Sequence, residues 1–312
     1  MSGWRPSSGV DTARRRAFLL GRARRYFGER GVLEVDTPAL SSAAVTDPNI
    51  GSLRTDDGLY LHTSPEFPMK RLLAAGYPDI YSICRVFRGG ESGRLHLPEF
   101  TMVEWYRLDF GLDDIIADTV RFIAAVLDRE KLQNSVRILD YRDAFLRTLY
   151  IDPLKASTET LMRAAAADSR LKASLGDRRD AWLDLLMATR IAPALDESAL
   201  TVIRHYPASQ AALARLSPDD DSVAERFEVF LGAVELANGY VELTDAREQE
   251  RRMDEDLKLR ASLQRPAVPK DAELLAALSA GLPDCAGVAV GFERLHMIAD
   301  GTDDIRNVVT FG

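Results

Sequence analysis

One stretch of the chain, residues 85–107, combines arginine, glycine, aromatic and acidic side chains in a pattern that suits a binding pocket. Its second half alternates, so that in a β-strand Phe100, Met102, Glu104 and Tyr106 would share one face. A buried carboxylate without a partner is energetically costly, so this face predicts a pocket for a positively charged group. Taken alone, the stretch is also compatible with an ordinary polar face of a sheet.

A second stretch repeats the combination of amide, aromatic and acidic side chains. Asn238, Tyr240 and Glu242 would share one face of a strand, and Glu228 and Glu235 are further acids in an otherwise apolar strand context. Hard cations prefer carboxylate oxygens, so the last two acids predict a Mg²⁺ ion that bridges bound phosphates. Surface charges on an edge strand would give the same local pattern.

The third stretch, residues 287–299, is a strand of small residues that turns into an apolar helix. Gly291 would let a planar ligand approach the backbone closely, because glycine has no side chain. Arg294, at the expected junction of strand and helix, is a permanent planar cation that suits phosphate. Glycine and arginine at this spacing are a weak signal alone, whereas the three stretches in this order are a strong one.

Composition narrows the classes of protein that could carry these stretches. The chain has 312 residues, a net charge of −8, two cysteines and four scattered histidines. The cysteines are too few for a disulfide framework, and the histidines lack the spacing of a metal site. The sequence contains no run of about eighteen apolar residues, so it predicts no membrane span. The negative net charge opposes broad binding to nucleic acid. We therefore expect a protein of the reducing cytoplasm.

Hydrophobic periodicity predicts the elements that position the three stretches. Helices are expected over residues 12–30, around 116–127, between about 155 and 198, and over 245–263. The first would be capped by Asp11 or Thr12 and ended by Gly31. Strands are expected over residues 59–62, 80–88, 100–108, 201–206, 227–243 and 287–298.

Several of these strands follow one another without a long helix between them. The sequence therefore predicts an α+β fold, in which an antiparallel sheet is flanked by helices, rather than a doubly wound parallel sheet. No repeat, low-complexity segment or linker divides the chain. Residues 1–10 are expected to form a flexible lead and residues 11–312 a single catalytic domain.

Together with two further segments, these stretches resemble the motifs of the class II aminoacyl-tRNA synthetases of the lysine type. Residues 31–38 (GVLEVDTP) look like motif 1, 85–107 like motif 2 and 287–298 like motif 3. Residues 62–66 and 237–246 resemble the segments that bind the amino acid in that family. The resemblance runs from about residue 12 to residue 300, and it implies the class II catalytic fold and a homodimer built around motif 1.

Only about thirty residues precede motif 1, too few for the anticodon-binding domain of a lysyl-tRNA synthetase. The chain therefore looks most like the truncated branch of the family that attaches lysine, often β-lysine, to a lysine side chain of elongation factor P. Segments 206–210, 224–228 and 283–291 look typical of that branch, and Ala289 stands where the synthetases usually have glycine. The implied partner is elongation factor P, with no stable tRNA binding and no membrane.

In such an enzyme the carboxylate of the amino acid attacks the α-phosphate of ATP, and an uncharged lysine amine of the acceptor then attacks the adenylate. The resemblance implies that Arg88 and Arg294 are the catalytic residues and hold the α- and γ-phosphates. Glu228 and Glu235 would hold Mg²⁺ on the phosphates, and adenine would lie between Phe100 and Arg294. The other residues implied for ATP are Glu91, His96, Leu97, Leu236 and Gly291. Those implied for the amino acid are Ser64, Glu66, Glu104, Tyr106, Asn238, Tyr240, Glu242 and Ala289.

Two positions depart from the family pattern. After the motif 2 arginine the family usually has Asn-Glu, whose glutamate contacts adenine, whereas this chain has Gly89 and Gly90 with Glu91 one place later. Either a shifted loop lets Glu91 make that contact, or adenine recognition is weaker. Leu97 replaces an asparagine that touches adenine mainly through its backbone, so we expect a mild effect.

Three other functions fit parts of the sequence. A stripped synthetase would charge tRNA, and a non-catalytic relic would bind an amino acid or a nucleotide as a sensor. A related amide-forming enzyme would require a smaller or differently charged pocket. Glu104 and Glu242 favour a cationic substrate, and the retained arginines and metal-type acids favour an active ligase.

Overall fold

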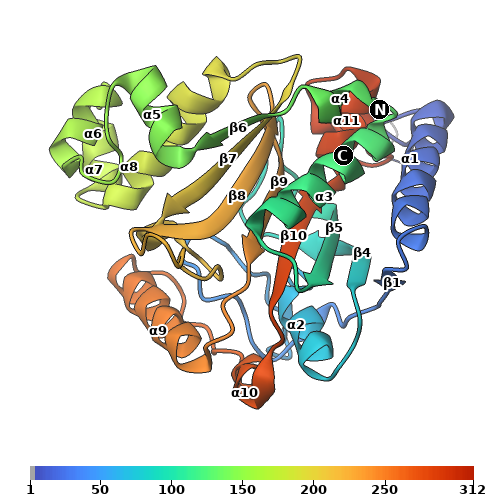
Figure 1. The fold of residues 1–312 in the computed structure, drawn as a ribbon, viewed down its shortest axis with the longest axis horizontal. Coiled ribbons are helices and arrows are strands. Elements are labelled where there is room, and N and C mark those ends of the chain that lie inside the picture. The colour runs from blue at the N-terminus through green and yellow to red at the C-terminus, as the bar shows by residue number, and fades with distance from the viewer. Residues whose placement is uncertain (1–3) are drawn as a thin grey trace.

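An eight-stranded sheet forms the centre of the computed structural model, which describes residues 4–312 (Figure 1). The strands lie in the order β1 (Leu33–Glu34), β4 (Ile80–Phe87), β5 (Glu99–Leu108), β10 (Cys285–Gly291), β9 (Val234–Val241), β8 (Val223–Leu231), β7 (Leu200–Pro207) and β6 (Arg137–Asp140). Neighbours from β4 to β7 are antiparallel, and the two edge strands are parallel to their neighbours. The predicted α+β class and antiparallel sheet are confirmed, with parallel pairing added at both edges.

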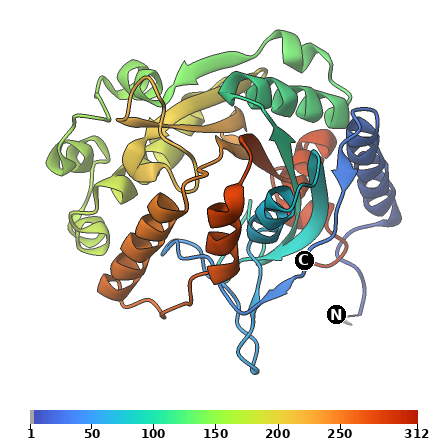
Figure 2. The ribbon, with the colours of Figure 1, turned by 60° about the horizontal axis from the view of Figure 1, so that its bottom comes forward.

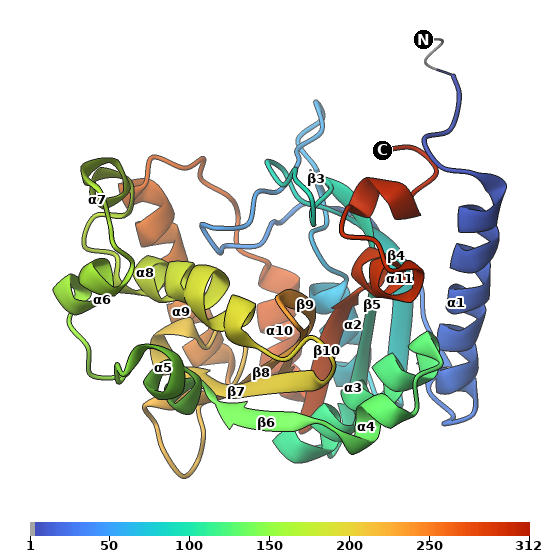
Figure 3. The ribbon, with the colours of Figure 1, turned by 90° about the horizontal axis from the view of Figure 1, so that it is seen from above.

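Helices α1 (Val10–Gly28), α3 (Leu112–Leu127) and α11 (Phe292–Asp300) pack on one face of the sheet (Figures 1 and 3). Odd-numbered side chains of β5 point to these helices. Trp105 meets Phe27 and Phe122 there, with ring centroids 5.3 and 4.8 Å apart. Because side chains alternate along a strand, this core turns the even-numbered residues of β5 to the opposite face.

Four short helices fill the long connection between the parallel strands β6 and β7. They are α5 (Tyr141–Leu149), α6 (Thr158–Ala164), α7 (Ser169–Leu175) and α8 (Arg179–Leu186), coloured green to yellow in Figure 1. Their apolar faces meet in a separate core around Phe145 and Trp182, which rests on Ile203 of β7. Parallel neighbours need such a crossover, so this lobe follows from the pairing at the edge of the sheet.

Helices α2 (Glu66–Ala74) and α10 (Ala272–Gly281) lie together at the lower ends of β4 and β10 in Figure 1, and Figure 2 shows them side by side from below. Met69 and Leu73 of α2 pack there against Leu274 of α10 and Tyr106 of β5. The charged helix α9 (Ala246–Ser262) lies beside them. A two-stranded sheet of β2 (Leu40–Ser41) and β3 (Tyr60–Leu61) and the short helix α4 (Lys131–Asn134) complete the elements.

Most predicted elements are present, with shifted ends. The first helix starts at Val10 with Gly9 as its N-cap, so the predicted caps Asp11 and Thr12 are wrong, and it ends at Gly28, ahead of Gly31. The single strand expected over 227–243 is a hairpin of β8 and β9, turned at Gly232 with a φ of +55°. Helices α2, α4, α5 and α10 were not predicted.

Residues 1–3 of the expected lead lie outside the described part of the chain. Within residues 4–312, every helix is too short or too polar to cross a bilayer.

Candidate active site

A cavity of about 620 Å³ lies on the face of the sheet opposite α1, α3 and α11. Every residue predicted for ATP or for the amino acid lines it; of the two predicted for Mg²⁺, Glu235 lines it and Glu228 does not. The sheet register explains this convergence. Glu104, Ala289 and Asn238 stand directly opposite one another on the neighbouring strands β5, β10 and β9, and therefore point to the same side.

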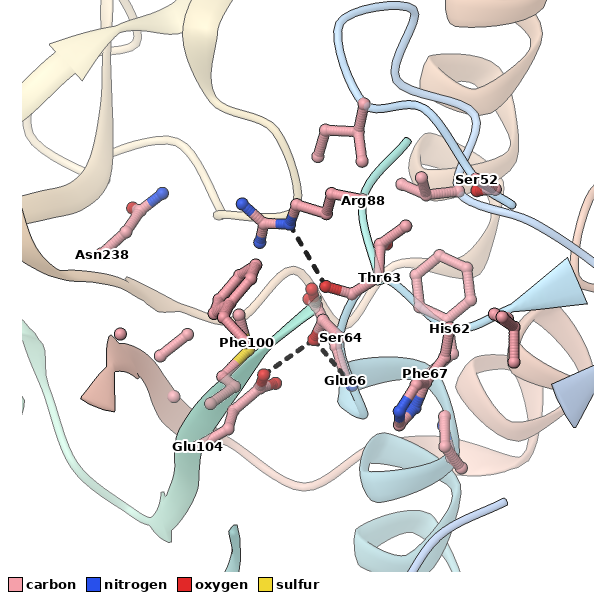
Figure 4. A pocket seen from close by; sticks show the side chains of 18 of the residues that line it. Ser52, His62, Thr63, Ser64, Glu66, Phe67, Arg88, Phe100, Glu104 and Asn238 are labelled. Atoms are coloured by element: carbon pink, nitrogen blue, oxygen red, sulfur yellow. Dashed lines mark hydrogen bonds between the residues drawn. The ribbon is translucent and has the colours of Figure 1, made fainter. Parts of the chain in front are cut away.

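One end of the cavity is acidic. Glu104 accepts hydrogen bonds from the Ser64 hydroxyl (2.7 Å) and the Tyr106 hydroxyl (2.8 Å). Figure 4 shows Ser64, at the start of α2, between the carboxylate of Glu104 and the backbone of Glu66. Glu242 also lines this end, and its buried Oε1 atom has no hydrogen-bond partner among residues 4–312.

Burial makes these carboxylates reluctant to ionise. It raises the pKa of Glu104 to about 7, and the charge of Glu66 adds to the shift. Burial also raises the pKa of Glu242 to about 8, against the opposing effect of the Lys70 ammonium. The side-chain Oδ1 atom of Asn238 is another buried acceptor without a donor in the described structure. Such a set of acceptors fits ammonium groups, which only donate hydrogen bonds.

The other end of the cavity carries two arginines. Arg294 donates from Nη1 to the Glu235 backbone oxygen (2.8 Å) and from Nη2 to Nε2 of His96 (2.9 Å). A guanidinium cannot accept, so His96 must accept with Nε2 and stay neutral there; burial, and next the Arg294 charge, lower the pKa of His96. Arg88 donates from Nε to the Thr63 backbone oxygen (3.3 Å) and lies 5.2 Å from the Phe100 ring centroid (Figure 4).

The two predicted metal acids lie on the same hairpin. Glu228 stands opposite Asn238 in the sheet, and it is buried against Arg226, whose Nη2 atom is 2.6 Å from its Oε1. Burial raises the pKa of Glu228 to about 7, and the charge of Glu235 adds to the shift, so the two carboxylates lie close enough to interact. No group of three or more metal-binding side chains occurs among residues 4–312. Two carboxylates fit Mg²⁺ that is held mainly by bound phosphates, because Mg²⁺ commonly takes one or two protein carboxylates together with phosphate oxygens.

The glycines that depart from the family pattern have a structural reason. Gly89 donates its backbone N–H to the Gly51 oxygen (2.7 Å) where two loops meet, and a Cβ atom on Gly89 would lie 3.1 Å from Leu53 Cδ2 and 3.5 Å from the Gly51 oxygen. Gly90 has a φ of +82°, which favours glycine. Glu91 follows directly and lines the cavity, with its Oε1 3.9 Å from Arg88 Nη1. Leu97 packs with Met297, Ile305 and Val308, so this position suits an apolar side chain.

Two buried charges next to the site were not predicted. Lys70 lies beneath the acidic end. The sequence contained a sign of its pairing, because Lys70 follows Glu66 by four residues, the spacing at which two side chains meet on one face of a helix. Glu293, adjacent to Arg294, accepts the backbone N–H of Thr101 (2.8 Å) and pairs with Arg16 of α1 (3.0 Å). The Arg16–Glu293 pair thus connects the first helix to the arginine end of the cavity.

Comparison with known proteins gives a consistent result. The family model of the class II tRNA synthetases (D, K and N) matches residues 5–312. Similar proteins include the elongation factor P–(R)-β-lysine ligases of Salmonella typhi, Salmonella paratyphi B and Salmonella heidelberg. Each is 44% identical over 319 aligned residues, which cover 99% of this chain and 97% of the relative. The matched region contains every residue that lines the cavity.

Proposed function

The chain belongs to the class II tRNA synthetase family (D, K and N), and from this premise we propose how its cavity works as the site of an ATP-dependent ligase. The enzyme activates lysine or (R)-β-lysine with ATP and ligates it to a lysine side chain of elongation factor P; the relatives named elongation factor P–(R)-β-lysine ligases support this function. The observation that carries this function is one cavity with a carboxylate-rich end and an arginine end. A diamine fits the first end, and a triphosphate fits the second.

The first step is attack of the amino-acid carboxylate on the α-phosphate of ATP. A phosphorus–oxygen bond forms, the bond to the β-phosphate breaks, and pyrophosphate leaves. Arg88 would hold the α-phosphate and Arg294 the γ-phosphate, so that positive charge faces the charge that develops on the phosphate oxygens. Glu228 and Glu235 are the residues that would hold Mg²⁺, which supplies further positive charge to the phosphates when bound.

No side chain has to act as a nucleophile in this scheme. The acidic end would hold the ammonium groups of the amino acid and leave its carboxylate free to point towards the arginine end. In the second step the uncharged amine of the acceptor lysine attacks the carbonyl carbon of the adenylate, an amide bond forms and AMP leaves. Residues 11–312 would carry out both steps as one domain, in the cytoplasm with its acceptor.

Pyrophosphate exchange and acceptor labelling test this function. Purified protein with ATP and Mg²⁺ is expected to exchange labelled pyrophosphate into ATP in the presence of lysine or (R)-β-lysine. When elongation factor P is also present, mass spectrometry should detect the addition of one lysine or β-lysine residue to that factor. Removal of Mg²⁺ with a chelator should abolish both reactions. Absence of exchange with both amino acids would refute the function, whereas charging of tRNA without modification of the factor would favour the stripped synthetase.

The raised pKa values of Glu104 and Glu242 predict a pH dependence of amino-acid binding. A bound ammonium favours the ionised carboxylates, so binding must release the protons that these groups hold in the free enzyme near neutral pH. The Michaelis constant for lysine should therefore fall as pH rises from 6 to 8, by up to about tenfold per pH unit for each proton released, and level off above that range. Exchange kinetics at saturating ATP measure this. A Michaelis constant for lysine that does not change from pH 6 to 8 would contradict the proposal that Glu104 and Glu242 bind the amino acid.

We also infer a homodimer, in line with the resemblance of residues 31–38 to motif 1. Leu33 of the edge strand β1 is 46% exposed, and Phe18 of α1 is 53% exposed. A second copy would cover these apolar side chains and the open edge of the sheet. Light scattering should give twice the mass of one chain at micromolar concentration; a single-chain mass would contradict the dimer.

A further inference from the structure

Lys70 is a lysine in a place where lysine is rarely found. Its side chain is 2% exposed, on α2 between the apolar residues Met69 and Leu73 of the same core. Its Nζ atom lies 2.7 Å from Glu66 Oε1 and 2.6 Å from Glu242 Oε2. A lysine almost never becomes fully buried without such partners, and here both partners line the cavity while Lys70 itself does not.

The charges at the acidic end can be counted from these contacts. Glu66, Glu104 and Glu242 are its carboxylates, and Lys70 is its cation, so three negative charges and one positive charge leave a net charge of −2 when all are ionised. The other titratable groups close to these acids include the phenols of Tyr106 and Tyr240 and the thiols of Cys84 and Cys285, all neutral near pH 7 because burial raises their pKa values. Arg71, Asp271 and Glu273 also line the cavity, where Arg71 pairs with Glu273.

Lys70 occupies one side of two of the three carboxylates. It takes Oε1 of Glu66 and Oε2 of Glu242, which leaves Glu242 Oε1 as a buried acceptor without a partner in the described structure. An ammonium of the substrate therefore has to share Glu66 and Glu242 with Lys70. Without the lysine, three carboxylates would share a small buried volume, and repulsion would force at least one of them to hold a proton.

We propose that Lys70 is a positioning residue that sets the acidic end, once its carboxylates are ionised, at two net negative charges, the number that a substrate with two ammonium groups neutralises. The inference rests on the proposed function, and it gives that function a physical basis for its substrate class. Lysine and β-lysine both bring two ammonium groups, whereas an apolar amino acid brings one. A ligand binds weakly if its complex leaves one buried charge of the pocket uncompensated. The fixed charge of Lys70 therefore disfavours amino acids that bring only one ammonium group.

Three variants separate charge from shape. Lys70→Met changes the net charge of the acidic end to −3, Glu66→Gln changes it to −1, and the double variant restores −2. Each single change should raise the Michaelis constant for lysine roughly tenfold to a hundredfold, and the double variant should regain at least tenfold over the worse single variant. In Lys70→Met the pH range over which the Michaelis constant for lysine falls should also shift upwards by about one pH unit or more. In the double variant this pH range should return to that of the wild type.

Substrate preference gives a second measurement. Norleucine has the length of lysine but only one ammonium, so Glu66→Gln should narrow the preference for lysine over norleucine by at least tenfold. The matched control is Lys270→Met, because Lys270 also pairs with two carboxylates, Glu250 at 2.9 Å and Asp254 at 2.8 Å, but outside the cavity. This variant should keep the wild-type Michaelis constants for lysine and ATP.

The outcomes distinguish this inference from the proposed function. A wild-type protein that exchanges pyrophosphate with neither lysine isomer refutes the function. A wild-type protein that does so, with a double variant no better than the worse single variant, refutes the role of Lys70 alone. If the single variants do not fold, titration calorimetry on the wild-type enzyme in two buffers of different ionisation enthalpy decides: lysine should release more protons on binding than norleucine, and equal release overturns the proposal.

Discussion

Replacement of Arg294 by alanine is expected to lower the rate of ATP–pyrophosphate exchange by about 10²-fold or more. The guanidinium is held before any ligand binds, by the Glu235 backbone oxygen at 2.8 Å and by His96 at 2.9 Å. A cation that is already in place stabilises charge in the transition state without reorganisation, and its loss costs about 3 kcal/mol of that stabilisation. The measurement is exchange at saturating lysine and ATP.

Arg306→Ala is the matched control for this variant. Arg306 lies in the next turn of the chain after α11, is exposed, and pairs with Asp304. It should exchange at the wild-type rate. Near-normal exchange by Arg294→Ala would mean that the arginine end does not act on the reacting phosphates, and the assignment of Arg294 would then fail.

The Gly287→Ala variant should bind the amino acid about 10²-fold more weakly while its Michaelis constant for ATP stays within about threefold of wild type. Gly287 lies on β10 directly opposite Tyr106 and Tyr240. A Cβ atom there would collide with the Tyr106 ring and lie 2.6 Å from Glu242 Oε1. Tyr106 in turn donates to Glu104, so one methyl group displaces two of the three acids, and displacements of about 1 Å can cost 10²-fold.

Amino-acid and ATP titrations of the exchange rate measure the effect of Gly287→Ala, and a thermal melt shows whether the variant is folded. Gly21→Ala serves as control, since Gly21 lies in α1 with no atom near the added Cβ, and alanine favours a helix. A folded Gly287→Ala enzyme with an unchanged constant for lysine would show that the amino acid does not bind against this strand.

The alternation of residue types was enough to predict which side chains of β5 and β9 share a face. Phe100 and Glu104 line the cavity together, as do Asn238 and Glu242. Every second side chain of a strand points to the same face, so this grouping can be predicted from the spacing of the residues alone. The resemblance to known motifs then joined the stretches into one site. Local pattern alone could not, since β5, β10 and β9 are neighbours in the sheet but far apart in the chain.

Other features depend on contacts that no local pattern contains. The pairing of Gly51 with Gly89 joins two loops, so the sequence showed an unusual Gly-Gly step without its reason. The Lys70 ammonium is paired across the cavity floor with Glu242, which lies on another element. The parallel edges of the sheet likewise depend on where long connections return. Burial of polar groups in pairs is therefore the part of this site that sequence patterns predict least well.

The pairing of Arg16 with Glu293 has a consequence for attempts to shorten the protein. Glu293 sits one residue before Arg294, is almost inaccessible to solvent, and would lose its closest cation if the first helix were removed. Arg85 would remain as a more distant cation, 3.7 Å from Glu293 Oε1, so the buried carboxylate would be less well compensated and would disturb the start of α11. A protein shortened past residue 16 should thus lose ATP–pyrophosphate exchange before it loses secondary structure, so the first helix supports the arginine end of the cavity and cannot be removed without cost to the reaction.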